Sequence, residues 1–149
     1  MIRGFEVVRD DARKFPEVEI KLPTRGTSKA MAYDVYSNAD YTVQPNEVVK
    51  VWTDVKAYMQ DNECLIGNVR SSMGGKYMLA NTIGIIDSDY YSNPDNDGNI
   101  GIFLKNISNT ELKIFKGDKI AQGIFIKYFK ADEDKTTLKR LGGFGSSGR

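Results

Sequence analysis

Apolar and polar residues alternate along several short stretches of this chain. The alternating stretches run from Val18 to Leu22, Val49 to Ala57, Ile100 to Leu104, Leu112 to Ile114 and Ile120 to Ile126. A period of two is typical of strands that bury one face. The pattern therefore predicts many short strands, as in an all-β sandwich, jelly roll or barrel.

Turn-forming residues separate these stretches, and little of the sequence favours helix. The turn signals are Thr24-Arg25-Gly26, Gln44-Pro45-Asn46, the run from Asn93 to Gly98, and Lys116-Gly117-Asp118. Helix is suggested only from Asp10 to Phe15 and from Ser71 to Leu79. We expect one folded domain with at most one short helix.

Composition and charge argue against several classes of partner. Lys and Arg number 21 against 20 Asp and Glu, so no strong overall field attracts nucleic acid or an acidic membrane. The N-terminus lacks the apolar core of a signal peptide, and no apolar run is long enough to cross a bilayer. The single cysteine, Cys64, cannot form an internal disulfide. We expect a cytoplasmic protein that binds neither nucleic acid nor membrane.

The chain contains no histidine, which narrows the chemistry open to it. Histidine is the commonest general base and the commonest transition-metal ligand. A Ser-His-Asp triad and a His/Cys zinc site are therefore excluded. Hydrolysis by this protein has to depend on carboxylates, hydroxyls or a hard cation such as Mg²⁺.

Two aspartates are candidates for such chemistry. Asp34 lies in the strand-like run Ala32 to Val35, either as a surface carboxylate or as an acid that orients water on a metal ion. Asp87 follows the apolar run Ile83 to Ile86 and precedes Tyr90. At the end of a buried strand, Asp87 would be partly desolvated and suited to act as a general base. The alternative is a strand followed by an ordinary polar turn.

Three further groups suit a nucleotide ligand. Arg70, Ser71 and Ser72 stand at a predicted helix start, where they would either bind phosphate or cap the helix. Gln122 follows the turn at Lys116 to Asp118 and offers an amide donor, although such a turn is usually just a hairpin connection. The glycine-rich tail from Gly142 is either a disordered terminus or an arm whose aromatic residue covers a flat base.

These groups, in this order, resemble the five motifs of the trimeric dUTPase family. The matching segments are Ala-Tyr-Asp at 32–34, Arg-Ser-Ser at 70–72, Gly-Ile-Ile-Asp-Ser-Asp-Tyr at 84–90, Gly-Asp-Lys-Ile-Ala-Gln at 117–122 and Gly-Gly-Phe-Gly-Ser-Ser at 142–147. Each motif alone is weak, but the ordered set is specific. The likeness is to bacterial (Gram-positive) or phage members.

The resemblance implies a fold, an assembly and a reaction. The fold would be a jelly-roll-like β-barrel, with a β domain at residues 1–140 and a flexible lid at 141–149. Three identical subunits would share the active sites. The second and fourth motifs would come from one subunit, the third from its neighbour and the tail from the remaining one. The reaction would be hydrolysis of dUTP to dUMP and pyrophosphate, which limits uracil in DNA and supplies dUMP for dTMP synthesis.

The resemblance also implies a role for each matching residue. Asp87 is similar to the general base, and Asp34 to the acid that holds water on Mg²⁺. Tyr90 is similar to the platform under deoxyribose, and Phe144 to the lid over uracil. The remaining substrate-binding residues implied are Arg70, Ser71, Ser72, Asn81, Gly84, Ile85, Ile86, Gly101, Gln122, Arg140, Ser146 and Ser147.

Two departures from the family pattern stand out. The run Ser92 to Asn99 replaces a shorter turn of many members, which predicts a longer substrate hairpin. Arg140 lies one residue closer to the tail glycines than usual, so Lys139 is an alternative phosphate contact. Two rival functions are a dCTP deaminase, which would need a glutamate base, and an additional role as a protein ligand that relieves a repressor.

Overall fold

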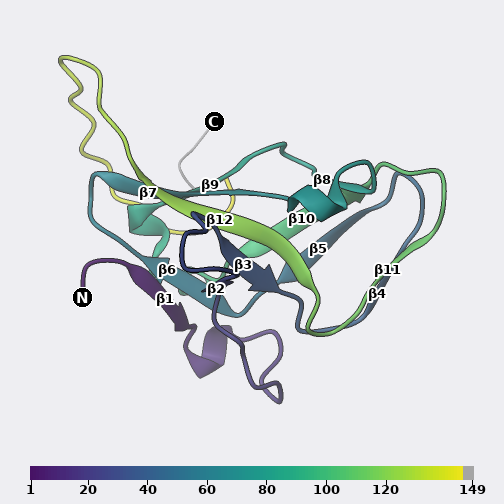
Figure 1. The fold of residues 1–149 in the computed structure, drawn as a ribbon. Coiled ribbons are helices and arrows are strands. Elements are labelled where there is room, and N and C mark those ends of the chain that lie inside the picture. Colours follow the sequence, from purple (N-terminus) through teal and green to yellow (C-terminus); the bar gives the residue numbers. More distant parts are fainter. Residues whose placement is uncertain (146–149) are drawn as a thin grey trace.

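Most of the alternating stretches form strands in the computed structural model, which describes residues 1–145 (Figure 1). The stretch from Val49 to Ala57 becomes two strands, because Asp54 breaks it with a left-handed φ of 55°. The strands are β1 (Gly4–Val7), β2 (Thr24–Arg25), β3 (Tyr33–Tyr36), β4 (Tyr41–Val43), β5 (Val48–Trp52), β6 (Val55–Tyr58), β7 (Glu63–Asn68), β8 (Tyr77–Leu79), β9 (Gly84–Asp87), β10 (Gly101–Asn106), β11 (Leu112–Ile114) and β12 (Lys119–Lys127). The all-β prediction is confirmed.

Antiparallel pairing organises these strands into layers. The widest sheet has the order β2-β3-β12-β7-β9, and a second has the order β5-β10-β8. Two further pairs are β1-β6 and β11-β4. Strand β7 lies between its two partners, with Gln122 of β12 opposite Asn68 and Asp87 of β9 opposite Cys64. This register fixes which residues of the wide sheet are neighbours.

The apolar faces of these strands bury two clusters. The larger is built around Val43, Val51 and Leu104, none of which is exposed to solvent. The smaller packs Leu65 of β7 against Tyr90 and includes Ala57 and Ile100. Burial of this apolar area is the main stabilising contribution to such a fold.

Helical structure is limited to single turns. Residues 1–145 contain no α-helix, and the 3-10 turns are η1 (Asp10–Ala12), η2 (Ser71–Met73) and η3 (Ser88–Tyr90). The predicted helix from Ser71 to Leu79 stops after its first turn, because Tyr77–Leu79 pairs with β10 as strand β8. The expectation of very little helix is confirmed.

Two local predictions are wrong. Val18 to Leu22 lies outside the strands, although its side chains alternate. Alternation indicates an extended backbone, but a strand also needs a neighbour with which to pair. Thr24 and Arg25, predicted as part of a turn, form the short edge strand β2 beside Asp34 and Tyr33.

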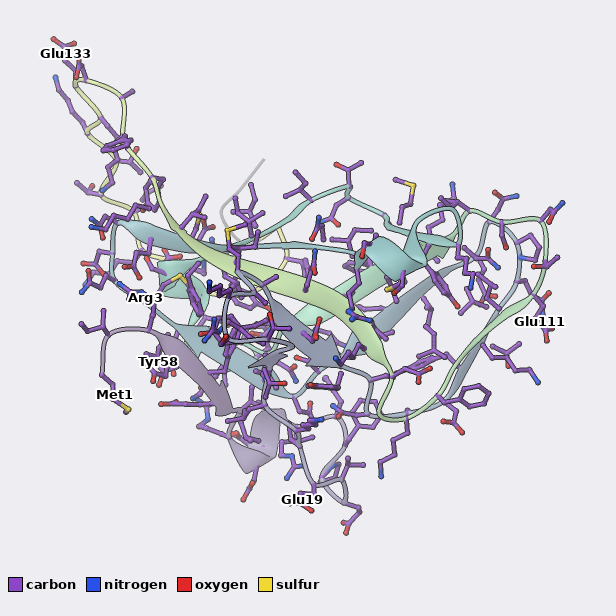
Figure 2. All side chains as sticks on the ribbon, viewed as in Figure 1. Met1, Arg3, Glu19, Tyr58, Glu111 and Glu133 are labelled. Atoms are coloured by element: carbon purple, nitrogen blue, oxygen red, sulfur yellow. The ribbon has the colours of Figure 1, made fainter. Side chains whose placement is uncertain are left out.

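The segment after β12 leaves the sheets. Residues 129–139 are exposed and form a loop that projects from the body of the molecule, with Glu133 near its tip (Figures 1 and 2). The chain then returns to β9 and β10, where residues 140–145 lie. Within residues 1–145, no helix has the length and apolar character needed to cross a membrane.

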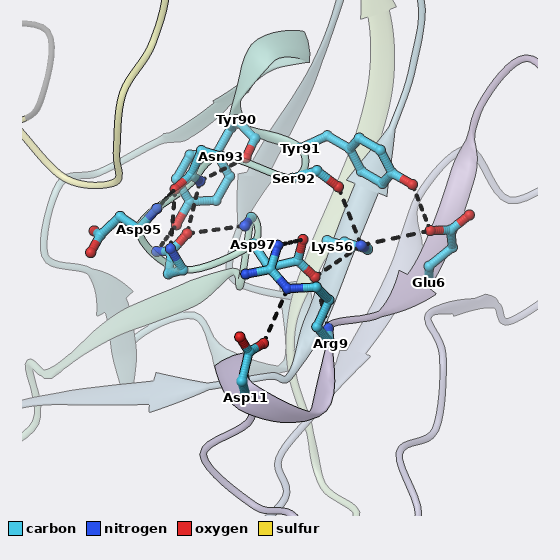
Figure 3. A network of polar contacts seen from close by, with 12 residues as sticks. Glu6, Arg9, Asp11, Lys56, Tyr90, Tyr91, Ser92, Asn93, Asp95 and Asp97 are labelled. Atoms are coloured by element: carbon cyan, nitrogen blue, oxygen red, sulfur yellow. Dashed lines mark hydrogen bonds and ion pairs between the residues drawn. The ribbon is translucent and has the colours of Figure 1, made fainter.

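A buried polar network attaches the N-terminal segment to the loop at 92–99 (Figure 3). Asp97 is 1% exposed and accepts hydrogen bonds from the Arg9 backbone N–H at 2.7 Å and from Lys56 Nζ at 2.9 Å. Burial raises the pKa of Asp97, but these hydrogen bonds outweigh burial and hold the pKa below its ordinary value. The ionised carboxylate therefore stabilises the fold.

We predict that Asp97→Ala lowers the free energy of unfolding by about 3 kcal/mol, because it leaves the buried Lys56 ammonium without its nearest carboxylate. Urea unfolding at pH 7 measures this change. The matched control is Asp11→Ala, which removes a carboxylate that also bonds Arg9 but is 74% exposed, so stability should barely change. Equal losses in both variants would contradict the prediction.

The ion pair of Asp97 with Lys56 predicts that the free energy of unfolding depends on pH. Because the folded pKa of Asp97 is lowered, its contribution is complete above the ordinary value of about 3.9. The contribution is lost as the pH falls further, through the lower folded value. The stability difference between wild type and Asp97→Ala should therefore stay constant from pH 7 to about pH 4 and shrink below it.

Candidate functional site

Three of the five motif groups meet in the wide sheet, at one end of β7. Asp34 of β3 lies opposite Gln122 of β12, and Gln122 lies opposite Asn68 of β7. The Gln122 Nε2 donates to Asn68 Oδ1 at 3.2 Å. Asp34 is buried and pairs with Arg70 Nε at 2.9 Å and Lys119 Nζ at 3.0 Å. The fold therefore brings together Asp34, Arg70 and Gln122.

A polar hollow opens beside this cluster. It is lined by Arg70, Ser72, Lys76, Tyr77 and Lys119, among others, so cations predominate over acids. The Tyr77 hydroxyl is buried and has no hydrogen-bond partner among the described residues. Such a cationic hollow suits phosphate oxygens.

Ser71 and Ser72 support neither helix interpretation. Both are exposed, and η2 is a single turn, so it has no helix dipole of the expected kind. No side chain caps this turn, which argues equally against the helix-cap alternative. Any phosphate binding here comes from cations and hydroxyls, with Arg70 Nη1 within 3.5 Å of Ser72 Oγ.

The surroundings of Asp34 limit how it could hold Mg²⁺. Its two oxygens already pair with two cations, and residues 1–145 contain no cluster of three or more His, Cys, Asp or Glu able to hold a metal. Mg²⁺ in phosphate sites commonly keeps several waters and uses few carboxylates plus substrate oxygens. Because both oxygens of Asp34 already pair with cations, the residues fit a metal ion that Asp34 would contact only through water.

An apolar pocket lies between β9 and β10. Its lining includes Asn81, Gly84, Ile85, Ile86, Gly101, Gln122 and Phe144, which are seven of the residues implied by the resemblance. Gly101 is crowded by side chains, since a Cβ atom there would lie 2.9 Å from Lys50 Cε and 3.1 Å from the Trp52 ring. These two side chains leave little space beside the Gly101 backbone.

Strand β9 is less buried than its apolar sequence predicted. Ile85 is 62% exposed and Ile83 53% exposed, because β9 is the edge strand of the wide sheet. An edge strand has backbone groups free on one side, which can pair with a ligand or another chain.

Asp87 ends β9 but lies in a different environment from the one expected. Its side chain is 54% exposed in the single chain, so the expected desolvation is absent there. Its Oδ2 accepts a hydrogen bond from Arg140 Nη2 at 2.6 Å, and Asp89 accepts one from Arg140 Nε at 2.8 Å. Arg140 thus pairs with the candidate base, whereas Lys139 is exposed.

Tyr90 is buried rather than open. Its ring packs in the smaller core cluster, and the Arg140 guanidinium lies 5.8 Å from the ring centroid. Burial raises the pKa of the Tyr90 hydroxyl, although a hydrogen bond from Asn96 acts in the opposite direction. Arg140 therefore lies beside the ring that the resemblance assigns to the sugar.

Phe144 lies on the apolar pocket in the single chain. Its ring makes edge contacts with Phe103 at 5.3 Å and Trp52 at 6.3 Å between centroids. Lys50 Nζ lies 4.2 Å from the Phe144 centroid, and burial lowers the Lys50 pKa. Ser146 and Ser147 lie outside the described residues.

Several contributing residues were missed by the sequence reasoning. Lys119 stands inside a quoted motif segment and Asn68 lies two residues before another, and only strand register reveals that they contact Asp34 and Gln122. Trp52 and Lys50 carry no motif at all, since their proximity to Phe144 arises from pairing of β5 with β10.

Within one chain, Gln122 and Asp87 lie at different positions along β7. Asn68 and Cys64, which mark the positions of Gln122 and Asp87 along β7, are separated by four residues. At about 3.3 Å per residue, this is roughly 13 Å. Within one chain, Gln122 and Asp87 therefore stand apart along β7.

Comparison with known proteins identifies the family of this chain. The dUTPase family model matches residues 18–148. The chain belongs to the dUTPase family. It is 40% identical to the deoxyuridine 5'-triphosphate nucleotidohydrolase of Lactococcus lactis, over 99% of this chain and 98% of that protein.

Solved structures give the same result for the fold. The Streptococcus mutans dUTPase is 34% identical, with a TM-score of 0.74 over 87% of this chain and 98% of that one. A dUTPase variant from Staphylococcus aureus phage phi11, described with a structural Mg(II) ion, has a TM-score of 0.68 over 93% and 98% at 19% identity. The predicted jelly-roll fold of the dUTPase type is confirmed.

We predict that Asp89→Asn speeds tryptic cleavage after Arg140 about threefold, because the variant removes one of two carboxylates that hold this side chain at 16% exposure. Mass spectrometry of timed digests measures the rate. Asp132→Asn, in the projecting exposed loop, is the matched control and should leave the rate unchanged. Identical rates in wild type and Asp89→Asn would contradict the Arg140 contact.

Proposed function

We propose that this dUTPase hydrolyses dUTP to dUMP and pyrophosphate, which limits uracil in DNA and supplies dUMP for dTMP synthesis. The observation that carries the proposal is the apolar pocket between β9 and β10. Asp87 stands at the end of one wall of this pocket, and Gln122, which lies next to the cationic cluster of Arg70 and Lys119, lines it. A flat base, a reacting phosphate and a carboxylate base are the parts that this reaction requires.

Asp87 is the proposed general base. It would take a proton from a water that attacks the α-phosphorus in line, while the bond from that phosphorus to the bridging oxygen breaks and pyrophosphate leaves. In the single chain, Arg140 forms an ion pair with Asp87. Phosphate oxygens compete for Arg140, so substrate binding would free the base and close the arm over the site.

Selection of the nucleotide follows from the pocket walls. Backbone groups of β9 and Gly101 can bond uracil O4, whereas cytosine would present an amino donor there and leave a buried group unpaired, at about 1–3 kcal/mol. The narrow approach at Gly101 leaves little room for the thymine methyl group. Tyr90 would pack against C2′ of the sugar and exclude ribose.

The phosphates would be bound by Arg70, Ser71, Ser72 and Gln122, with Asn81 at the base. When bound, Mg²⁺ supplies charge neutralisation of the triphosphate, and Asp34 would hold it through water. The pairing of Asp34 with Arg70 and Lys119 keeps those two cations facing the hollow.

The assembly we propose is a homotrimer. The separation of Asp87 from the cationic cluster within one chain supports a site shared between subunits. In that arrangement residues 1–140 form the β domain and 141–149 a lid, including Ser146 and Ser147, that closes over another subunit's site. In the single chain the arm instead contacts its own Asp87 and Phe103.

The structure gives little support to a repressor-binding role for the loop at 92–99. Asn93, Asp97 and Asn99 are buried, and their polar groups bond within the protein. The loop is part of the fold, so we propose catalysis as the function.

We predict that the protein hydrolyses dUTP in strong preference to dCTP, dTTP and UTP and needs a divalent cation. Pyrophosphate release across the four nucleotides, with and without chelator, measures this. Equal turnover of dCTP and dUTP, or full activity in excess chelator, would rule the proposal out.

We predict that Asp87→Asn cuts kcat by about 10²–10⁴-fold while nucleotide binding persists, because asparagine keeps the shape but accepts no proton. Mixing this variant with chains truncated before Gly142 should restore some activity through hybrid trimers if the arm acts between subunits. Wild-type turnover by Asp87→Asn would disprove the base assignment, and hybrids without activity would place the arm on its own chain.

A further inference from the structure

Tyr90 is held in place by the loop at 92–99, which is outside the five motifs. The loop follows Tyr91 directly, where the chain departs from the shorter turn of many relatives. Several of its side chains face inward: Asn93 is 3% exposed and Asn99 is fully buried. This arrangement gives the loop direct contact with the ring proposed to meet the sugar.

Both hydrogen-bonding sides of the Tyr90 hydroxyl are occupied by this loop. Asn96 Nδ2 donates to Tyr90 Oη at 2.9 Å, and Tyr90 Oη donates to the Asn99 carbonyl at 2.7 Å. A buried hydroxyl with a donor and an acceptor on opposite sides resists rotation and tilting of its ring. The position of the ring therefore depends on Asn96.

Asn96 is itself fixed by the loop. Its Oδ1 accepts hydrogen bonds from Asn93 Nδ2 at 2.8 Å and from the Gly98 N–H at 3.0 Å. Asn93 Nδ2 also donates to the Tyr90 carbonyl at 2.8 Å. The loop thus holds Tyr90 at its backbone and at its hydroxyl.

The loop is anchored from the opposite side of the molecule. Asp97, next to Asn96, pairs with Lys56 of β6 and with Arg9 (Figure 3). A Cβ atom at Gly98, where φ is 87°, would lie 2.8 Å from the Tyr90 carbonyl, so this close turn needs glycine. These contacts fix the position of Asn96 beside the Tyr90 hydroxyl.

We propose that Asn96 is a positioning residue that fixes the Tyr90 ring and thereby sharpens the selection of deoxyribose over ribose. The inference rests on the proposed function, in which this ring packs against the sugar. A fixed ring leaves no space for a 2′-hydroxyl, whereas a ring that can tilt gives way to it. Loss of the hydrogen bond from Asn96 to Tyr90 should therefore raise UTP turnover relative to dUTP turnover.

The sharpest variant is Asn96→Asp. Aspartate keeps an oxygen for Asn93 Nδ2 and the Gly98 N–H, so the loop can keep its fold. It replaces the donor to Tyr90 Oη by a second acceptor, which has to compete with the Asn99 carbonyl for the one hydroxyl proton. We expect the ratio of kcat/KM for UTP to that for dUTP to rise about fivefold to tenfold, as for the loss of one buried hydrogen bond. Asn96→Ala should move the ratio in the same direction without adding charge.

Two controls separate positioning from general damage to the loop. Ser92→Ala, in the same loop, removes a hydroxyl that bonds Lys56 but not Tyr90, and should leave the ratio unchanged. In a Tyr90→Phe background, Asn96→Ala should add little, because the hydroxyl through which it acts is gone. If Asn96 had a purely structural role, Asn96→Ala would instead lower the free energy of unfolding equally in the wild-type and Tyr90→Phe proteins.

The movement of the ring gives a readout that does not need turnover. NMR of protein with labelled tyrosine, with the Tyr90 signals assigned by their loss in Tyr90→Phe, should show faster ring flips in Asn96→Asp and Asn96→Ala than in Ser92→Ala. Unchanged ring flips, or ratios within about twofold of wild type in both Asn96 variants, would overturn the inference. Wild-type protein without dUTP turnover would overturn the proposed function, and with it the sugar-selection part, while faster flips would still establish Asn96 as the support of the ring.

Discussion

The register of β7 between β12 and β9 determines where the functional groups of the wide sheet lie. It places Gln122 beside Asn68, Gly84 beside Gly67 and Asp87 beside Cys64. Side chains alternate along a strand, so a slip of one residue would turn each of them to the opposite face. The cationic cluster and the acid therefore hold a fixed separation that no loop movement can change.

Two groups of charged side chains, one rich in cations and one rich in acids, lie near the two ends of β7. At one end, a single buried carboxylate, Asp34, is outnumbered by Arg70 and Lys119. At the other, Asp87 and Asp89 face one cation, Arg140, which the returning arm brings to them. A triphosphate has affinity for every cation in both groups, so binding of substrate would rearrange the arm while the β7 frame stays fixed.

In the loop at 92–99, buried polar residues fix the loop conformation as well as stabilising the fold. Each of its internal amides is satisfied, and Asp97 is ionised because Arg9 and Lys56 reach it. A half-satisfied network of this kind would be costly. Its completeness fits a loop selected for a fixed geometry around Tyr90.

The sequence alone determined the fold class, because period-two alternation and turn residues are local properties of the chain. It also located the motif residues, including Asp34, Arg70 and Asp87, since their order in the chain matches a family. It failed at Val18 to Leu22, where an extended segment found no partner, and at Ile85, which alternation could not place on an edge.

Only the tertiary structure decided which residues act together. Asn96 and Tyr90 are six residues apart, but their contact depends on a loop conformation set by Asp97 and by the left-handed φ at Gly98. Trp52, Lys50 and Phe144 meet because β5 pairs with β10 and the arm returns to them. Such contacts come from strand register and chain return, which depend on long-range pairing and are not encoded in any local pattern.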